Sequence, residues 1–536
     1  MKTAHVDPNH RLADFDFEVR WGVLIIGRFY DDAFDAAGIV LGNQLVPKEE
    51  GHQPKEVKNF FHFNKVMRTQ PCGAQKVHAR STFSFKKLST SLHVHWMRRD
   101  LRLADNRALL SALEQAASTD RVAIAFIFDQ NILGRLEYPS DRRVAFLHRE
   151  LHAIGERLKS FGGQLLVGYG DPQAVWNEWM DTWSVQGMAL ASVHVGRDYE
   201  PYAQERDRAM ADFFASRNVT FKGVKDSVIL EKNEVTKDDG KPYTVFTPYS
   251  RKWRKILSAM DYAEAPSLEQ AQSAAWLAVP EAEVPSLAEM GFEACPELDD
   301  LVPPRNIETE VLDAYGAKRD FPAIPGTSRL SLHLRFGTIG IRQALRAGLQ
   351  HSEKWTTELI WRDFYQMIIY HFPHSVEGSF RPAYDAIPWD NNEAHFAAWC
   401  AGKTGYPLVD AGMRELNATG FMHNRVRMVV ASFLCKHLLT DWRWGERYFA
   451  AKLLDFDLAS NVGGWQWASG SGCDAAPYFR VFNPTSQLEK FDKELRYVRK
   501  WVPEYGTSAY PDPIVDHKTA RLRAIDTYQS VLKPSA

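Results

Sequence analysis

The sequence has 536 residues, and its 65 Lys and Arg nearly balance its 67 Asp and Glu, so the formal net charge at pH 7 is −2. With 45% hydrophobic and 25% charged residues, the composition excludes a disordered or fibrous chain. The length predicts about three to four domains, or two large domains with extensions. The near-neutral charge excludes a uniformly basic surface, so any nucleic-acid-binding surface must be a local patch.

The five cysteines are scattered and form no CxxC pair, which indicates neither a disulfide framework nor a zinc site, and no metal is expected. The sequence contains no run of about 18 apolar residues that could span a membrane. These features favour a protein of a reducing compartment that does not contact a membrane. We expect a cytoplasmic protein of the bacterial intracellular type.

Residues 1–91 show no sustained hydrophobic period and are expected to form an extension with little structure. The stretch 67–91 carries five basic residues and no acidic one, as organelle-targeting sequences do. An upstream extension without a targeting role is the favoured interpretation.

Residues 92–221 alternate between short apolar runs and segments of helical period. Strands are predicted at 92–97, 122–128, 164–167 and 192–195, and helices at 106–117, 143–159 and 172–181. Strands that alternate with helices predict a doubly wound parallel sheet. The lone Gly168-Tyr169-Gly170 after a strand is expected to be a turn and not a dinucleotide site.

The second half of the chain has a different character. Residues 222–304 are expected to be a connector, since 262–304 is rich in Ala, Pro and Glu with few β-branched residues. From 305 to 536 apolar residues recur with helical period, which predicts an all-helical domain. Nine of the 16 tryptophans lie in the last 182 residues, where even spacing would place about five. This excess indicates that some tryptophans of the helical half have a functional role.

The segment 358–365 places four functional side chains on one face of a predicted helix. Glu358, Trp361, Arg362 and Tyr365 follow at i, i+3, i+4 and i+7, so a carboxylate, an indole, a guanidinium and a phenol lie together. An ordinary Glu358–Arg362 ion pair beside a buried Trp361 explains the same spacing. This motif alone leaves both interpretations open.

Residues 417–428 open a predicted apolar helix that runs to about 439. Asn424 and Met428 share a face of this helix, with Arg425 beside them. Arg425 and Arg427 suit backbone phosphates if that end is exposed, because guanidinium groups bind phosphate oxygens in pairs. A single arginine near a helix start is otherwise an ordinary solvated charge.

Residues 455–472 combine four glycines, two tryptophans, two acids and an asparagine. Glycines permit close approach of the backbone to a flat ligand, the acids can accept hydrogen bonds from it, and Trp467 can stack on a base. Upstream, Gly-Thr-Ser-Arg-Leu-Ser at 326–331 forms a predicted turn into a helix, with hydroxyls, N–H groups and a cation suited to phosphate. A plain helix N-cap is the alternative for that turn.

These motifs, together with residues 315–321, 405–410 and 483–484, closely resemble the photolyase/cryptochrome family, and within it the class I cyclobutane pyrimidine dimer photolyases. The resemblance runs from Leu92 to Tyr528 and leaves residues 1–91 outside. It implies an α/β antenna domain at 92–221, an interdomain connector at 222–304 and a helical FAD-binding and DNA-lesion domain at 305–536.

The resemblance also implies roles for three sets of residues. The FAD contacts would be Tyr315, Thr327, Ser328, Arg329, Leu330, Ser331, Trp355, Glu358, Asp455, Phe456, Asp457 and Asn461. The catalytic set would be Glu358, Asn461 beside flavin N5, and the electron-carrying Trp465, Trp442 and Trp389. The lesion and DNA contacts would be Arg319, Trp361, Arg362, Tyr365, Asn424, Arg425, Met428, Trp467 and Gln487.

A second, antenna chromophore is a further implication, either methenyltetrahydrofolate or a deazaflavin. Glu200 matches a glutamate that contacts folate in relatives. However, Ser379 stands where folate-using relatives have Lys, and the usual pocket histidine is replaced near Glu137 and Tyr138. The resemblance therefore leaves the identity of the antenna open.

The implied activity is light-dependent DNA repair, in which reduced FAD gives an electron to a cyclobutane pyrimidine dimer and splits it. The dimer must be flipped out of the duplex to reach a buried flavin. Trp361 and Trp467 would form the walls of the lesion pocket, and Glu358, if burial keeps it protonated, would donate a hydrogen bond to a carbonyl that gains charge. We expect a monomer that binds UV-damaged DNA.

Two other functions of the family are weighed against dimer repair. A cryptochrome-type flavin photosensor is the alternative, but no long low-complexity tail follows Trp501. Six-four photoproduct enzymes have two histidines near the positions of Asn424 and Met428, and this chain has neither. Dimer repair is favoured.

Overall fold

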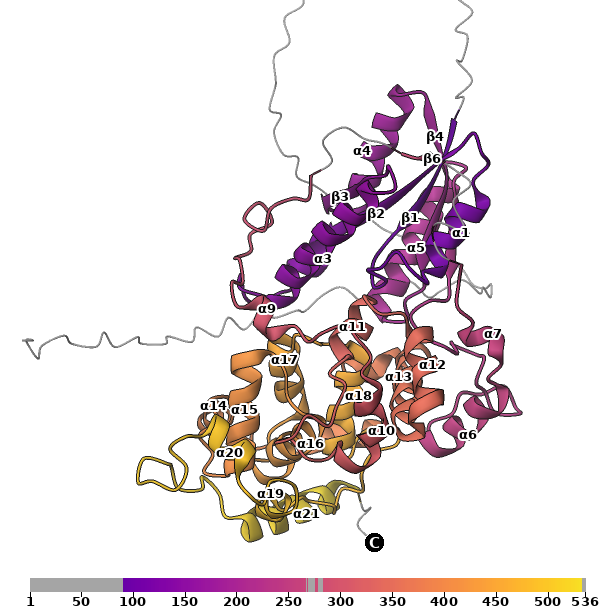
Figure 1. Ribbon diagram of the computed structural model, residues 1–536. Helices are drawn as coiled ribbons and strands as arrows, with labels where there is room; N and C mark the ends of the chain where they lie inside the picture. The colour runs from indigo at the N-terminus through magenta and orange to yellow at the C-terminus, as the bar shows by residue number, and fades with distance from the viewer. Residues whose placement is uncertain (1–89, 267, 269–274, 278–282, 533–536) are drawn as a thin grey trace, which may run out of the picture. The chain divides into compact units, whose positions relative to one another are not determined.

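The computed structural model describes residues 90–266, 268, 275–277 and 283–532 (Figure 1). The prediction of little structure in residues 1–91 lies outside these ranges except for Thr90 and Ser91, which begin the first strand. None of the helices within these ranges is long and apolar enough to cross a membrane.

The first part of the chain is an α/β unit with a parallel sheet. Its strands lie in the order β3-β2-β1-β4-β5, and every pairing is parallel. This confirms the predicted doubly wound architecture. The elements are β1 (Thr90–Trp96), α1 (Arg107–Gln115), β2 (Arg121–Asp129), α2 (Gln130–Leu133), α3 (Arg142–Lys159), β3 (Leu165–Gly170), α4 (Pro172–Val185), β4 (Met188–Gly196), α5 (Pro201–Ala215) and β5 (Thr220–Val224).

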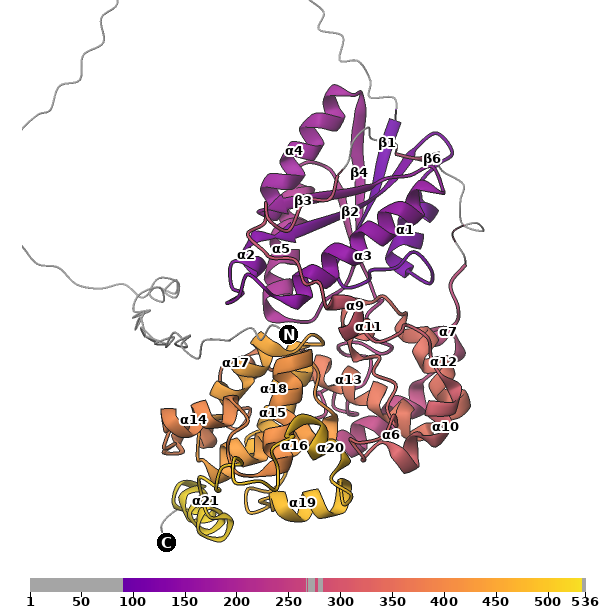
Figure 2. The ribbon, with the colours of Figure 1, turned by 60° about the vertical axis from the view of Figure 1, so that its left-hand side comes forward.

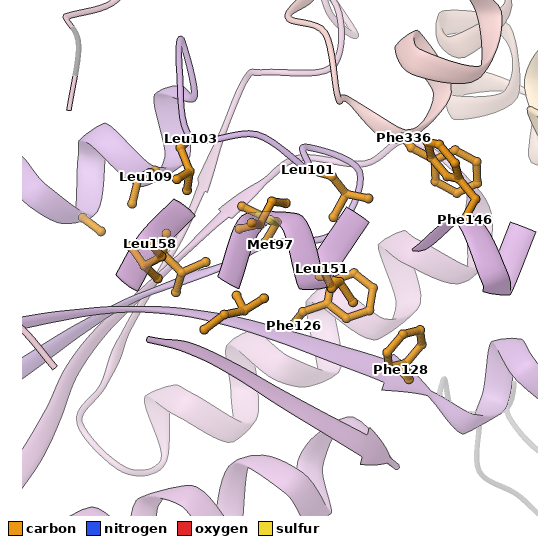
Figure 3. Close-up of a cluster of buried hydrophobic side chains, with 14 of the residues drawn as sticks. Met97, Leu101, Leu103, Leu109, Phe126, Phe128, Phe146, Leu151, Leu158 and Phe336 are labelled. Carbon is orange, nitrogen blue, oxygen red and sulfur yellow. The ribbon is translucent and has the colours of Figure 1, made fainter. Parts of the chain in front are cut away.

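Alternate residues of strand β2, which lies between β1 and β3, face two different helical layers. Ile124 and Phe126 pack with α1 and α3, whereas Ala125 and Ile127 pack with α4 and α5. Figure 3 shows the first of these clusters, which also takes in Phe336 from the helical half of the chain. Burial of β2 on both faces is what the nearly continuous apolar run of a parallel strand requires.

The turn predicted at Gly168-Tyr169-Gly170 is wrong, because these residues form the end of β3 and pair with β2 from Ile127 to Asp129. The sheet also extends beyond the expected limits of the α/β part. β5 crosses position 221, and β6 (Ala275–Trp276), within the expected connector, pairs in parallel with Arg121 and Val122 of β2. Among the described residues of the connector, the other elements are α6 (Phe246–Ile256), α7 (Ala259–Tyr262) and α9 (Leu298–Leu301).

Residues 305–532 contain helices and no strand, as the helical period predicts (Figure 2). The helices α13, α16 and α17 all contact α18. The helices are α10 (Thr309–Lys318), α11 (Ser331–Phe336), α12 (Ile341–His351), α13 (Glu353–His371), α14 (Glu393–Cys400), α15 (Pro407–Thr419), α16 (Asn424–Ser432), α17 (Trp442–Lys452), α18 (Leu458–Ser469), α19 (Pro484–Phe491), α20 (Arg496–Trp501) and α21 (His517–Leu532). Short 3-10 turns lie at Pro373–Val376 and Pro382–Ala386.

The long helix predicted from 417 to about 439 is interrupted. Gly420, with φ of 69°, ends α15, and α16 begins only at Asn424 after the side chain of His423 caps it. A π-helical turn at Phe433–His437 then replaces the last part of the predicted helix.

Two glycines allow α18 to pack closely between α13 and α17. A Cβ atom on Gly463 of α18 would lie 2.3 Å from the Tyr365 ring of α13. A Cβ atom on Gly445 of α17 would lie 2.1 Å from the Trp465 ring of α18. At both positions only glycine leaves room for the aromatic ring.

We therefore predict that Gly445→Ala destabilises the protein by about 1–3 kcal/mol, the usual effect of overpacking a core. In an unobstructed helix the same change would stabilise by about 0.5–1 kcal/mol. Gly155→Ala in α3 is the matched control, because its Cβ would meet only Leu165, at 3.9 Å. Denaturant unfolding measures both variants, and a Gly445→Ala protein as stable as Gly155→Ala would contradict the packing described.

Three buried histidines give the fold an acid-sensitive stability. Burial lowers the pKa of His194 to about 3, with Lys222 adding to the effect. Burial likewise lowers the pKa of His423 to about 4 and that of His437 to about 3. These histidines are neutral in the folded protein, whereas the unfolded chain takes up protons near the ordinary pKa of about 6.5.

Their contribution to stability is therefore complete above about pH 6.5 and is lost as the pH falls toward 4. Each unit of pKa difference corresponds to about 1.4 kcal/mol, so we predict a loss of several kcal/mol across this interval. The free energy of unfolding measured from pH 7 to 4 tests this. In His437→Leu the free energy of unfolding should fall less between pH 7 and pH 4 than in the wild type. A wild-type free energy of unfolding that does not change over this range would show that the histidines are not neutral in the folded protein.

Candidate functional site

A cavity of about 400 Å³ lies among α13, α16, α17, α18 and the turn before α11. This volume is in the range of small-molecule and cofactor sites. Its wall brings together most of the residues expected to bind the cofactor and several expected to contact the lesion. The predicted residues that line it are Tyr315, Thr327, Ser328, Arg329, Leu330, Ser331, Trp355, Glu358, Trp361, Arg362, Tyr365, Asn424, Met428, Asp455, Asp457, Asn461 and Trp465.

The turn before α11 presents hydroxyl groups to the cavity. Arg329 takes a left-handed conformation with φ of 54°, and α11 starts two residues later at Ser331. The indole of Trp355 donates a hydrogen bond to the Ser328 hydroxyl at 3.2 Å. This confirms a turn into a helix, and the turn lies at the cavity wall with the Ser328 side chain bonded to α13.

The predicted face of α13 is confirmed, since its four functional side chains all line the cavity. Trp361 stacks on Phe246 with ring centroids 3.6 Å apart and planes 4° apart. Arg362 does not pair with Glu358. Its guanidinium donates to the carbonyls of Ser227 and Leu334, so the simple ion pair considered from the spacing is wrong.

Glu358 instead forms an ion pair with Arg319. The Glu358 side chain is 33% exposed, so the burial on which its proposed hydrogen-bond donation depended is not found. Although burial opposes it, the Glu358 carboxylate raises the pKa of Arg319 above its ordinary value. Glu358 therefore lines the cavity as one half of a neutral ion pair, and its partner Arg319 lies outside the cavity wall.

The two arginines at the start of α16 are both paired. Arg425 donates to Asp320 at 2.7 Å and lies over the Phe491 ring. Arg427 donates to both oxygens of Asp455, at 3.0 and 3.1 Å, and lines the cavity. Arg427 thus braces a cavity wall, a role that the phosphate interpretation missed.

Asp457 and Asn461 open the helix α18. The Asp457 carboxylate caps it by accepting from the Ser460 N–H at 3.0 Å and from the Ser460 hydroxyl at 2.8 Å. The Asn461 amide donates to Glu446 Oε1 at 2.9 Å, which fixes its orientation at the cavity wall. Gly464 also lines the cavity, and a Cβ there would meet nothing within 4 Å.

The three tryptophans expected to carry electrons lie in neighbouring segments. Trp465 lines the cavity and packs against α17, whose first residue is Trp442. The segment after Trp389 is fastened to the residues before Trp442, because Asp390 N–H donates to Leu439 O and Asp441 N–H to the Asn391 side chain, both at 2.8 Å. Trp442 is buried, and Trp389 is half-buried.

Eight predicted site residues lie outside the cavity wall, namely Glu200, Arg319, Trp389, Arg425, Trp442, Phe456, Trp467 and Gln487. Trp467 borders a separate small cavity of about 20 Å³. The Phe456 ring lies beneath Arg143, and its carbonyl accepts from Arg335. The Glu200 carboxylate is bonded to Arg99 at 2.7 Å.

The cavity also has lining residues that the sequence did not reveal. Besides Arg427, they are Leu334, Arg335, Leu359, Phe421, Met422, His423, Ala431, Phe449, Leu453, Ser460 and Gly464. Arg335 follows Ser331 by four residues on α11, so helical spacing from the Gly-Thr-Ser-Arg-Leu-Ser turn is the signal that could have found it.

Comparison with known proteins supports the interpretation of this cavity as a flavin site. Residues 93–270 match the family described as DNA photolyase, and residues 355–509 match the FAD binding domain of DNA photolyase. The deoxyribodipyrimidine photo-lyase of Synechococcus sp. is 37% identical over 79% of this chain and 93% of its own length.

Solved structures show the same likeness. A class III photolyase from Agrobacterium tumefaciens superimposes with a TM-score of 0.73 and 33% identity, covering 84% of this chain and 100% of its own. A photolyase from Sulfolobus tokodaii with two FAD molecules gives a TM-score of 0.70 and 32% identity, covering 82% of this chain and 100% of its own. On its sequence and its structure, the chain belongs to the DNA photolyase family.

Proposed function

We propose that this protein is a deoxyribodipyrimidine photo-lyase, which uses light and FAD to split cyclobutane pyrimidine dimers in UV-damaged DNA. The observation that carries the proposal is the single cavity wall that joins the expected cofactor residues to the expected lesion residues. The names of the relatives support the same activity.

The cavity suits FAD by the chemistry of its donors. Hydroxyls and N–H groups of residues 327–331 and the guanidinium of Arg329 suit a pyrophosphate. Two cavity-lining side chains, Arg335 and His423, have buried nitrogen atoms that form no hydrogen bond with the described residues, although Arg335 Nη1 lies 3.4 Å from the Glu200 carboxylate. Buried polar groups normally have partners, so these atoms support a polar ligand. Reduced FAD held there would supply the electron that splits the dimer.

The lesion pocket in this proposal uses Glu358, Trp361, Asn424 and Met428, which share the wall of the same cavity. A dimer flipped out of the duplex would meet an aromatic ring and polar groups there. Because the lesion gains an electron during repair, the neutral Glu358–Arg319 pair repels it less than a lone carboxylate would. Tyr365 and Arg362 support this wall, and Arg425, Trp467 and Gln487 are proposed as contacts to the DNA around the lesion.

The remaining parts of the proposal concern the supply of electrons to the flavin, the domain limits, the oligomeric state, the cellular location and the second chromophore. Trp389, Trp442 and Trp465 would carry electrons from the surface to photoexcited flavin, and Asn461 would lie beside flavin N5. The domain limits 92–221, 222–304 and 305–536, a monomeric state, a cytoplasmic location and a second chromophore stay predictions of the sequence.

The experiment is to illuminate the chemically reduced protein with an oligonucleotide that contains one thymine dimer. Light-dependent recovery of the intact thymines, together with extraction of FAD from the protein, is the expected result. A protein that binds FAD but repairs no dimer would overturn the proposal and favour a flavin photosensor.

A further inference from the structure

Arg99 connects the α/β part of the chain to the wall of the cofactor cavity. It lies three residues after β1, at the carboxyl edge of the sheet. One of its terminal nitrogens donates to Glu200 at 2.7 Å and to Asp198 at 3.1 Å, both beyond the end of β4. Its other terminal nitrogen donates to Asp457 Oδ2 at 2.7 Å. A single guanidinium therefore bridges two sheet-edge carboxylates and a carboxylate of the cavity.

All four of these groups are shielded from solvent. Their side chains are between 10% and 17% exposed. Ion pairs at this depth are screened little, and removal of one partner leaves a charge without compensation. This is unlike a surface ion pair, whose contribution is small.

Asp457 uses its two oxygens for different tasks. Oδ1 caps α18 through Ser460, and Oδ2 accepts from Arg99 and from Gln366, the latter at 3.2 Å. The helix that Asp457 caps carries Asn461, Gly464 and Trp465 into the cavity. The position of Arg99 thus bears directly on the orientation of the carboxylate that starts this helix.

The backbone beside Arg99 is fixed against the same wall. Gly337, just after α11, has φ of +68°, and a Cβ there would lie 2.1 Å from the Arg99 carbonyl oxygen. Leu101 N–H donates to Phe336 O at 3.0 Å. Phe146 of α3 packs on Phe336 with ring centroids 5.2 Å apart (Figure 3). Arg99 therefore projects from a segment that is held rigidly on α11.

We infer that Arg99 is a positioning residue of the flavin site, which orients the Asp457 carboxylate from the α/β part of the chain. The inference rests on the proposed occupancy of the cavity by FAD. It also gives Glu200 a different role from the antenna contact expected from the resemblance, because the Glu200 carboxylate is one of the anchors of Arg99.

The charged groups around Asp457 agree with this role. Burial raises its pKa, but Arg99, Arg335 and Arg362 outweigh burial and lower the pKa to about 2. Glu200 and Asp198 are the acids that face the same arginines. Without Arg99, Asp457 would bind a proton at a higher pH and would lose one of its two bonds at Oδ2.

The test measures FAD binding by the full-length apoprotein, by titration with FAD at pH values from 8 to 4. Arg99→Met should weaken FAD binding about tenfold or more, the usual effect of losing a hydrogen bond to a charged group. It should also move the acid limb of the binding curve to higher pH. Arg99→Lys should restore part of the affinity, because an ammonium keeps the charge but cannot bridge both sides.

Arg142→Met is the matched control. Arg142 of α3 also reaches the helical part, where it donates to Asn417 O at 3.4 Å, but it contacts no residue of the cavity wall. It should leave both the affinity and the pH profile unchanged. The unfolding of each apoprotein is measured in parallel, so that loss of the fold is distinguished from loss of FAD binding. If Arg99→Met does not fold, the FAD affinity and the pH profile of Arg99→Lys test the inference.

Wild-type affinity and pH profile in Arg99→Met, or an equal change in Arg142→Met, would overturn the inference while the proposed function stands. A wild-type protein that binds no FAD would overturn the proposed function and the inference together.

Discussion

Trp389→Phe is expected to slow the photoreduction of oxidised flavin by an order of magnitude or more, and to leave repair by the chemically reduced protein unchanged. Phenylalanine is much harder to oxidise than tryptophan, so the chain of indoles would lose its outer donor. Repair by reduced protein needs no electron from the surface. The two readouts should therefore separate in this variant.

The structure supplies a control for this experiment. Trp399 is fully buried and meets the Trp465 ring edge-on, with centroids 6.1 Å apart, but it lies outside the proposed chain. Trp399→Phe should leave photoreduction near the wild-type rate. Absorbance of the oxidised flavin under steady illumination measures the first readout, and recovery of intact thymine measures the second. Equal loss of both in Trp389→Phe would remove Trp389 from the electron path.

Glu358→Ala is expected to lower the repair yield per absorbed photon about tenfold, because it removes the carboxylate that holds Arg319 beside the lesion pocket, and a hydrogen bond between charged groups contributes about 1.5–3 kcal/mol. Affinity for undamaged DNA should change much less, since Glu358 lines the cavity and is not proposed to contact the phosphate backbone. The variant would also leave Arg319 with only the more distant carboxylate of Asp320, at 4.0 Å.

Glu358→Gln separates the loss of charge from the loss of hydrogen bonding. It keeps the size and a hydrogen-bonding amide, so it should retain more activity than Glu358→Ala. Quantum yields with a dimer-containing oligonucleotide, alongside dissociation constants for undamaged duplex, measure the difference. If Glu358→Ala repairs with the wild-type yield, Glu358 has no part in splitting the dimer.

The parts of the site that depend on local spacing could be predicted from the sequence. The four side chains of α13 reach the cavity together because residues at i, i+3, i+4 and i+7 share a helix face whatever surrounds it. The turn before α11 could also be predicted, because it depends only on consecutive residues. The alternation of strands and helices likewise sufficed for the sheet, because a parallel strand needs a crossover to reach its neighbour.

The errors concern partners that are distant in the sequence. Glu358 and Arg362 are spaced for an ion pair, but Arg319 takes the carboxylate and two backbone carbonyls take the guanidinium. Spacing shows which groups can meet, and tertiary packing decides which of them do. The bridge from Arg99 to Asp457 is beyond any local pattern for the same reason.

The second group of wrong predictions concerns segments where the backbone departs from a regular α-helix. The break between α15 and α16 and the π-helical turn at Phe433–His437 interrupt a stretch whose apolar period is continuous. Gly420 is a local sign of the first break, since its φ of 69° favours glycine. The π-helical turn has no comparable sign in the sequence.

The position of strand β6 in the sequence determines when the sheet can be completed during synthesis. Its two residues leave the ribosome about 50 residues after the end of β5, yet they pair with β2 near the beginning of the sheet. The sheet is thus still incomplete when its first five strands have been synthesised. A fragment that stops at residue 221 would cut β5 and lack β6, so a shortened version of the α/β part is better ended beyond residue 277.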